Sequence, residues 1–369
     1  MKPLFRFLRP KPELVPEPVV SLPIPKREVE LMVTLLPSFP HFGKFVRDPR
    51  LSGIRLNSAM LTNFDLDEEL KRIPHHVRTP LYFDIKGRQL RVTKVHPDRE
   101  FLDFELNHPV QVNVPTPILF KGGEDSALLS WMHDGEKWCG EGLDPIDPHR
   151  WYQRFRVKFG PKYKVNVGES IHIRDGSLHV GGNQFVDMEL KKIEQVKKFG
   201  LTRWFLSYVQ SQRDVDEFLE LVGRDAEVFL KIESKQGLEY VAREFKKRDN
   251  LRLCAAKGDL YVEVDMPHEI LTAQKLIIEK DPRALAGSRM LLSVINKVPH
   301  VAIGQEGTPV VKYAIEPSDV PSNADFEQLA WLYEIGYRSF MLCDELCLRG
   351  DLLSVATDAL DAFKQYYCH

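Results

Sequence analysis

The sequence predicts an α/β fold, a (β/α)8 barrel with a small β-rich domain inserted after its third strand. Short apolar runs alternate with amphipathic segments from Val29 to Arg91, helix patterns stop from about Val92 to Val180, and the alternation resumes after Gln184. Strands that alternate with helices favour a parallel sheet. Because eight such strands can be counted, each followed by a helix apart from the insertion, we expect the sheet to close into a barrel.

Each expected strand is an apolar run that ends at proline, glycine or charge, and each expected helix is an amphipathic segment. Asp65 predicts the N-cap of the second helix. The expected barrel strands are Val29–Leu36, Ile54–Ser58, Leu81–Arg91, Trp204–Val209, Val228–Ile232, Leu251–Ala256, Leu285–Ser293 and Phe340–Glu345. The expected helices are Phe42–Asp48, Leu66–Ile73, Val186–Phe199, Asp214–Val222, Leu238–Lys247, Met266–Lys280, one that begins at 321–326, and Leu352–Tyr366.

The same pattern divides the chain into regions. Residues 1–27 are rich in proline and are expected to form an extended arm. Residues 28–91 and 185–369 are expected to form the barrel, and residues 92–184 the inserted β-rich domain. Its expected strands are Phe101–Leu106, Gln111–Val114, Ile118–Lys121, Lys164–Val167 and Ser170–Ile173. The role of residues 296–320 stays open.

The composition excludes several classes of function. The 369 residues carry a formal net charge of −2 without a basic block, so nucleic-acid binding has no electrostatic support. No apolar run reaches the length that spans a bilayer, and we expect no membrane partner. The 5 cysteines are odd in number and scattered, which indicates reduced thiols and a cytoplasmic location.

Charged side chains follow two neighbouring strands at the point where each ends. Lys231 lies in one strand and Glu233 just after it, and the next strand ends in Lys257-Gly258-Asp259. In a parallel barrel the chemistry lies at the carboxyl ends of the strands. Two carboxylates on adjacent strands, with room for substrate oxygens, suit Mg²⁺ or Mn²⁺, and a lysine beside them can neutralise an enolate or phosphoryl oxygen. The alternative is a solvated network of ion pairs.

These segments resemble the pyruvate kinase family. Lys231-Ile232-Glu233-Ser234 with Gly237 is similar to its Lys-Ile-Glu-Asn segment, and Ala256-Lys257-Gly258-Asp259-Leu260 to its Ala-Arg-Gly-Asp-Leu segment. The resemblance implies a TIM barrel of the phosphoenolpyruvate/pyruvate type, and covers about residues 29–365 without that family's C-terminal regulatory domain. Further matching segments are Arg55-Leu56-Asn57, Asp84–Arg91, Val167–Gly176, Phe205–Val209, Leu285–Ser293, Pro321–Phe326 and Phe340–Glu345.

The resemblance also implies roles for single residues. Glu233 and Asp259 would hold Mg²⁺, Lys231 would stabilise the transferring phosphoryl group, and Ser207 and Ser288 would lie near the substrate. Arg55 is implied as a further catalytic residue that faces nucleotide or transferred phosphate. On the cofactor side the resemblance implies Arg91 for nucleotide or phosphate, Asn57 and Asp84 for a monovalent cation such as K⁺, and Lys257 and Gly258 beside them. It also implies that the inserted domain, residues 92–184, is a lid that closes over the nucleotide.

The chain differs from that family at positions that would bind K⁺ and nucleotide. Ser58-Ala59-Met60 stands where the family has Phe-Ser-His-Gly, Ile85 stands at a threonine, and Gln89 at a glutamate. Lys257 and Asn323 each replace an arginine. This pattern is typical of a divergent relative rather than of the glycolytic enzyme itself.

Three hypotheses follow. The first is a Mg²⁺-dependent phosphotransferase that uses phosphoenolpyruvate or a related 2-oxo acid, with ADP/ATP as possible co-substrate. The second is a metal-dependent lyase or aldolase that works through a pyruvate-type enolate without a nucleotide. The third is a non-catalytic binding protein. In each case the expected partner is a small carboxylate or phosphate molecule, and a homo-oligomer stays open.

Overall fold

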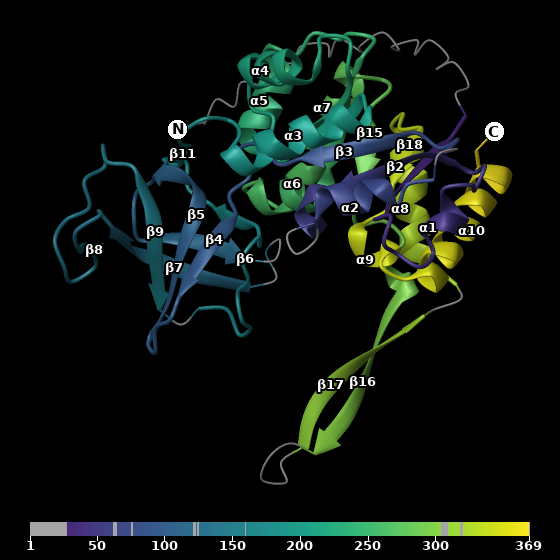
Figure 1. Cartoon of the computed structure of the whole chain (residues 1–369). Helices are drawn as coiled ribbons and strands as arrows, with labels where there is room; N and C mark the ends of the chain where they lie inside the picture. The colour runs from purple at the N-terminus through teal and green to yellow at the C-terminus, as the bar shows by residue number, and fades with distance from the viewer. Residues whose placement is uncertain are drawn as a thin grey trace, which may run out of the picture.

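The centre of the molecule is a closed barrel of eight parallel strands, as the sequence predicted (Figure 1). The computed structural model describes residues 28–61, 65–74, 77–120, 123, 125–158, 160–303, 309–317 and 320–368. The predicted arm, residues 1–27, lies outside the described residues. Around the barrel the strands follow the order β1-β18-β15-β14-β13-β12-β3-β2. Their bounds are β1 Glu30–Thr34, β2 Leu51–Asn57, β3 Leu81–Ile85, β12 Arg203–Leu206, β13 Glu227–Ile232, β14 Leu251–Ala256, β15 Leu285–Gly287 and β18 Ser339–Met341.

Helices surround the barrel and bury their apolar faces against it (Figure 1). They are α1 Phe42–Phe45, α2 Leu66–Lys71, α3 Asp187–Phe199, α4 Gln212–Val222, α5 Lys235–Arg243, α6 Lys257–Glu263, α7 Glu269–Lys280, α8 Asn323–Glu334, α9 Asp344–Cys347 and α10 Gly350–Tyr366, with 3-10 turns at Ser58–Leu61 and Leu292–Val294. Asp65 caps α2 by accepting from the Asp67 N–H, as predicted. Helix α5 begins earlier than predicted, because the Ser234 hydroxyl accepts the N–H of Gly237 and caps it.

The third strand is shorter than predicted. It ends at Ile85 rather than Arg91, because the chain turns at Gly87, where φ is +53°. The Gln89 N–H donates to the Lys86 carbonyl across this turn. Glycine tolerates the left-handed conformation that such a turn needs. The charged residues after β3 therefore lie in a turn over the barrel mouth.

Residues 92–180, between β3 and α3, form an antiparallel sheet (Figure 1). Its core is an apolar cluster that includes Phe104, Phe120 and Phe155. The predicted strand Gln111–Val114 is wrong beyond Gln111, and 164–167 form no strand. The strands are β4 Val92–His96, β5 Phe101–Gln111, β6 Thr116–Phe120, β7 Asp125–His133, β8 Trp138–Gly140, β9 Tyr152–Lys158, β10 Ile171–Ile173 and β11 His179–Val180.

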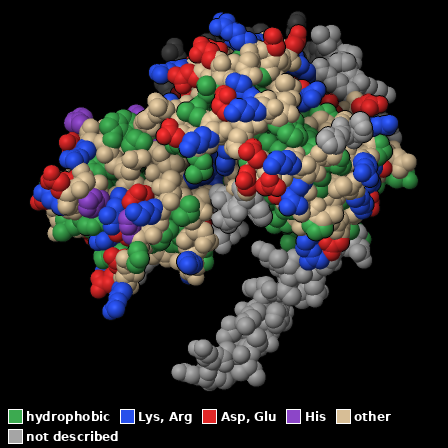
Figure 2. All heavy atoms as spheres, in the orientation of Figure 1, with side chains coloured by type: hydrophobic (Ala, Val, Ile, Leu, Met, Phe, Trp, Pro, Cys, Tyr) green, Lys and Arg blue, Asp and Glu red, His purple; other side chains and the backbone are tan. Residues whose placement is uncertain are grey.

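A two-stranded hairpin follows the seventh barrel strand. Strands β16 (Ile295–Ile303) and β17 (Pro309–Pro317) pair antiparallel and project away from the barrel (Figure 1). Acidic and basic side chains are intermixed over the face shown in Figure 2, on both the barrel and the antiparallel sheet. None of the helices in the described part of the chain has the length and apolar character that a membrane crossing requires.

Candidate active site

The alternation of side chains along the strands places the polar cluster inside the barrel. Successive residues of a strand point to opposite faces, so every second residue points inward. A layer of apolar side chains fills the interior: Met32, Tyr82, Phe205, Phe229, Cys254, Leu285 and Met341. Two residues further along these strands, at the carboxyl ends, stand Thr34, Asp84, Ser207, Lys231 and Ala256. The same period therefore builds an apolar floor and, directly above it, a polar site.

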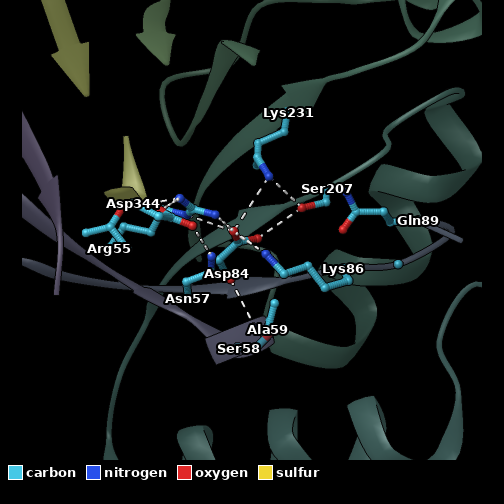
Figure 3. Close-up of polar contacts among 12 residues, drawn as sticks. Arg55, Asn57, Ser58, Ala59, Asp84, Lys86, Gln89, Ser207, Lys231 and Asp344 are labelled. Carbon is cyan, nitrogen blue, oxygen red and sulfur yellow. Dashed lines mark hydrogen bonds and ion pairs between the residues drawn. The ribbon is translucent and has the colours of Figure 1, made fainter. Parts of the chain in front are cut away.

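Asp84 is the centre of the polar cluster (Figure 3). Its Oδ2 accepts from Arg55 Nε at 2.8 Å and from Lys86 Nζ at 2.7 Å. Its Oδ1 accepts from the Ser207 hydroxyl at 3.0 Å, and Lys231 Nζ lies 3.6 Å from Oδ2. Both carboxylate oxygens are thus satisfied by protein groups.

Burial and charge oppose each other in this cluster. Burial alone would raise the pKa of the Asp84 carboxyl, but the charges of Lys231, Lys86 and Arg55 outweigh burial and hold this pKa well below its usual range. Burial lowers the pKa of Lys86 to about 7, against the attraction of Asp84. The pKa of Lys231 is raised instead, because Asp84 and Glu233 outweigh its burial. Lys231 is therefore a firmly charged ammonium at the barrel mouth.

Glu233 and Asp259 lie in contact beside Lys231. Glu233 is fully buried; its Oε1 is 2.7 Å from Lys231 Nζ, and its Oε2 accepts the Tyr208 N–H at 2.8 Å. Burial, and then the charge of Asp259, raise the pKa of Glu233 despite Lys231, whereas the His172 imidazole holds the pKa of Asp259 low against burial.

Ser288 connects the last two predicted site segments. Its hydroxyl accepts the Gly258 N–H at 3.0 Å, and the Lys257 ammonium donates to the Arg289 carbonyl at 3.1 Å. Ser288 and Arg289 both have left-handed backbone, with φ of 62° and 52°. Tyr208, at the end of β12, is left-handed too, with φ of 53°. Such strained positions gather at functional sites, where the surrounding structure holds them.

Arg91 joins the antiparallel sheet domain to the barrel mouth. Its Nη1 donates to the Gly168 carbonyl at 2.5 Å, and its Nε donates to Gln89 Oε1 at 3.0 Å. It makes no ion pair with a carboxylate in the described part of the chain. The guanidinium is thus held in place while its charge stays available to an anion.

A pocket of about 260 Å³ opens above the cluster. Glu233 does not line this pocket, but its Oε1 contacts Lys231, which does. No three His, Cys, Asp or Glu side chains form a metal-binding group within the described ranges. Of the predicted site residues, Arg55, Asn57, Arg91, Lys231, Gly258, Asp259 and Ser288 line the pocket; Asp84, Ser207 and Lys257 adjoin it through the contacts given above.

For two of the predicted roles, other protein groups already contact the side chains that would bind the ligand. Asn57 and Asp84 are expected to bind a monovalent cation, yet Lys86 and Arg55 contact Asp84, and the Asn57 amide donates to Asp344 Oδ2 at 2.7 Å. Arg55 is expected to bind phosphate, yet its Nη1 donates to Asp344 Oδ1 at 2.9 Å. Protein charges therefore already engage the groups that a cation and a phosphate would use.

The sequence pattern did not predict four residues of the site: Lys86, His172, Glu189 and Asp344. Lys86 and Asp344 follow the strand ends of β3 and β18, so the pattern that identified Glu233 could have identified them. Glu189 accepts the N–H groups of Lys86 and Gly87 and supports the turn after β3. His172 alternates with Ile171 and Ile173, a buried position with no strand-end signal.

The buried charged cluster and the small pocket lie at the carboxyl ends of the strands of a closed parallel barrel. Barrels of this class place their chemistry at that face. Comparison with protein-family models finds no match for the chain, and comparison with curated proteins finds none either. The function is therefore argued from the site itself.

Proposed function

We propose that the chain is a Mg²⁺-dependent phosphotransferase related to pyruvate kinase, on a barrel of the phosphoenolpyruvate/pyruvate type. The phosphoryl group would pass from the enol oxygen of phosphoenolpyruvate, or a related enol phosphate, to the terminal phosphate of a nucleoside diphosphate. The enolate that remains takes up a proton and becomes the 2-oxo acid. The observation that carries the proposal is the pair of cations, Lys231 and Arg91, that line one small pocket with the carboxylate of Asp259.

The size and charge of the pocket support a small anionic substrate. Its volume of about 260 Å³ suits a molecule with a carboxylate and one phosphate. Lys231 Nζ, held by Glu233 and Ser207, supplies a fixed positive charge where an enolate or phosphoryl oxygen gains charge. Arg91 presents a planar guanidinium that matches phosphate geometry.

The carboxylates fit a divalent cation. Glu233 Oε1 is buried and has no hydrogen bond of good geometry among the described residues, although Lys231 is close. Asp259 adjoins it and faces the pocket. Mg²⁺ typically uses one or two carboxylates and completes its shell with substrate oxygens and water. Glu233 and Asp259 would hold the ion, which when bound neutralises charge on the substrate's carboxylate and phosphoryl oxygens.

The experiment for this proposal is pyruvate release from phosphoenolpyruvate and ADP with Mg²⁺. Native protein is expected to turn over, and Lys231→Met to lose turnover by at least about 100-fold, because it removes charge stabilisation of the transition state. Lys235→Met, at an exposed lysine after the same strand, is the matched control and is expected to retain activity. Native turnover at background, at high protein concentration, would refute the proposal.

One observation favours a second candidate, a metal-dependent lyase or aldolase. Asp344 engages both Arg55 and Asn57, which would otherwise serve phosphate and a monovalent cation. A site that forms a pyruvate enolate without nucleotide needs only Lys231, Glu233 and Asp259. Its test is Mg²⁺-dependent exchange of the pyruvate methyl protons in D₂O. Exchange without phosphoryl transfer would support this candidate, and absence of exchange would refute it.

A further inference from the structure

His172 is a buried histidine that reaches the barrel from the antiparallel sheet domain. It lies in β10, and its side chain is fully shielded from solvent. Its Nε2 is 3.3 Å from Asp259 Oδ1, and its Nδ1 is 2.9 Å from Glu263 Oε1. The Tyr208 hydroxyl lies 2.9 Å from the same Nδ1. The His172 ring therefore contacts Asp259, a carboxylate of the candidate metal site, through Nε2, while Glu263 and Tyr208 hold the ring at Nδ1.

The ring also separates two cavities. His172, Tyr208 and Glu263 line a cavity of about 940 Å³ between the antiparallel sheet domain and the barrel. Asp259 lines the smaller pocket on the other side. His172 is thus not in the substrate pocket and acts on it only through Asp259.

Two buried polar atoms flank Asp259 without good hydrogen bonds among the described residues, namely His172 Nε2 and Glu233 Oε1. The approach of Nε2 to Asp259 is an ion pair. The position of the ring beside Oδ1 restricts how the Asp259 side chain can turn.

We infer that His172 is a positioning residue that orients Asp259 for the divalent cation, so that docking of the antiparallel sheet domain completes the metal site. The inference rests on the proposed function, because it assigns His172 to that function's metal. Hydrogen-bonded groups behind a metal ligand fix its orientation, and their loss typically weakens metal affinity 10–100-fold. Here the group comes from a separate sheet, so domain docking and metal binding are coupled.

His108 provides a matched control. It is also a buried histidine of the antiparallel sheet domain, and its Nε2 lies 3.0 Å from the Gly87 carbonyl of the barrel. His108→Leu removes a docking contact without touching Asp259. A role of His172 in docking alone would make the two leucine variants equivalent.

The experiment is calorimetric titration of Mg²⁺ in the presence of oxalate, an analogue of the pyruvate enolate. His172→Leu is expected to weaken Mg²⁺ affinity about 10–100-fold. His172→Gln, which places an amide donor beside Asp259, is expected to recover part of the loss, and His108→Leu to stay within about twofold of native. Thermal unfolding checks that each variant is folded. If His172→Leu does not fold, Tyr208→Phe, which removes one hydroxyl behind the ring, is expected to weaken Mg²⁺ in the same direction.

Three results would overturn the inference. Unchanged Mg²⁺ affinity in His172→Leu, or in Tyr208→Phe where that variant replaces it, removes the positioning role and leaves the proposed function intact. An equal loss in His108→Leu assigns the effect to docking alone. A native protein that binds no Mg²⁺–oxalate refutes the metal site of the proposed function, and the inference falls with it.

Discussion

Lys86 Nζ lies 2.7 Å from Asp84 Oδ2, inside the barrel mouth. The ammonium thus stands beside the carboxylate that the sequence assigned to a monovalent cation. An ammonium and a K⁺ ion carry the same charge, so one can serve electrostatically in place of the other. We expect Mg²⁺–oxalate binding by the native protein at pH 6, below the lowered pKa of Lys86, to be the same in K⁺ and in tetramethylammonium.

Lys86→Met is expected to create a dependence on K⁺, because it leaves Asp84 short of one positive charge. Calorimetry measures Mg²⁺–oxalate affinity in the K⁺ and tetramethylammonium salts. Only the variant is expected to bind Mg²⁺–oxalate more tightly in K⁺, by at least about threefold. A native protein that already requires K⁺ would show that Lys86 does not fill this role.

Asp84→Ala is expected to destabilise the fold by roughly 3–5 kcal/mol, because it removes the buried carboxylate that Arg55, Lys86 and Lys231 share. Arg55 and Lys231 each keep another carboxylate partner, whereas Lys86 keeps none among the described residues. Urea unfolding measures the loss. Arg213→Ala, which breaks the exposed Arg213–Glu217 pair on α4, is the control and is expected to cost at most about 1 kcal/mol. A loss at Asp84 no larger than at Arg213 would contradict the central place given to this carboxylate.

Arg91→Lys is expected to weaken phosphoenolpyruvate binding about 10–100-fold, the equivalent of one charge-assisted hydrogen bond, and oxalate binding less. A lysine cannot keep the contacts to Gly168 and Gln89 and still present a planar group to phosphate. Arg88→Lys, at an arginine that lines the larger cavity, is the control. Equal losses for both ligands would assign Arg91 to general attraction of anions instead of phosphate recognition.

Glu189 gives a pH dependence of stability. Burial raises its pKa to about 6 from an ordinary value of 4.5, so the folded state binds the proton more tightly than the unfolded state. Its charged form is therefore unfavourable above pH 6, and stability is regained as pH falls from 6 toward 4.5. Relative to Glu189→Gln, native stability should rise by about 1 kcal/mol between pH 7 and pH 5. Urea unfolding measures this difference, and a constant difference would contradict the buried charge.

The barrel could be predicted because its signals are local. Each strand is a short apolar run, and the charges of Lys231, Glu233 and Asp259 lie at strand ends or just after them. A parallel barrel brings all such ends to one face, so their proximity follows from the fold class. The limits of single elements were less predictable, as at Ile85, where the turn at Gly87 ends the strand early.

The rest of the site depends on contacts that no local pattern carries. His172 lies in the antiparallel sheet and Asp259 lies in α6 of the barrel, so their approach follows only from how the domain docks. Asp344 carried the strand-end signal, but its bonds to Arg55 and Asn57 link the end of β18 to β2, the two strands on either side of β1, which lie far apart in the sequence. Tyr208 adopts left-handed backbone, which tertiary packing imposes and a tyrosine does not favour by itself.

The most direct test of the central claim is calorimetric titration of oxalate with and without Mg²⁺, on the native protein and on Glu233→Gln. The variant keeps the shape of the side chain and an acceptor for the Tyr208 N–H, but loses the charge that would hold the cation. Mg²⁺-dependent binding by the native protein, weakened at least about tenfold in the variant, is the predicted result. Binding that ignores Mg²⁺, or that is equal in both proteins, would contradict a metal-assisted enolate site.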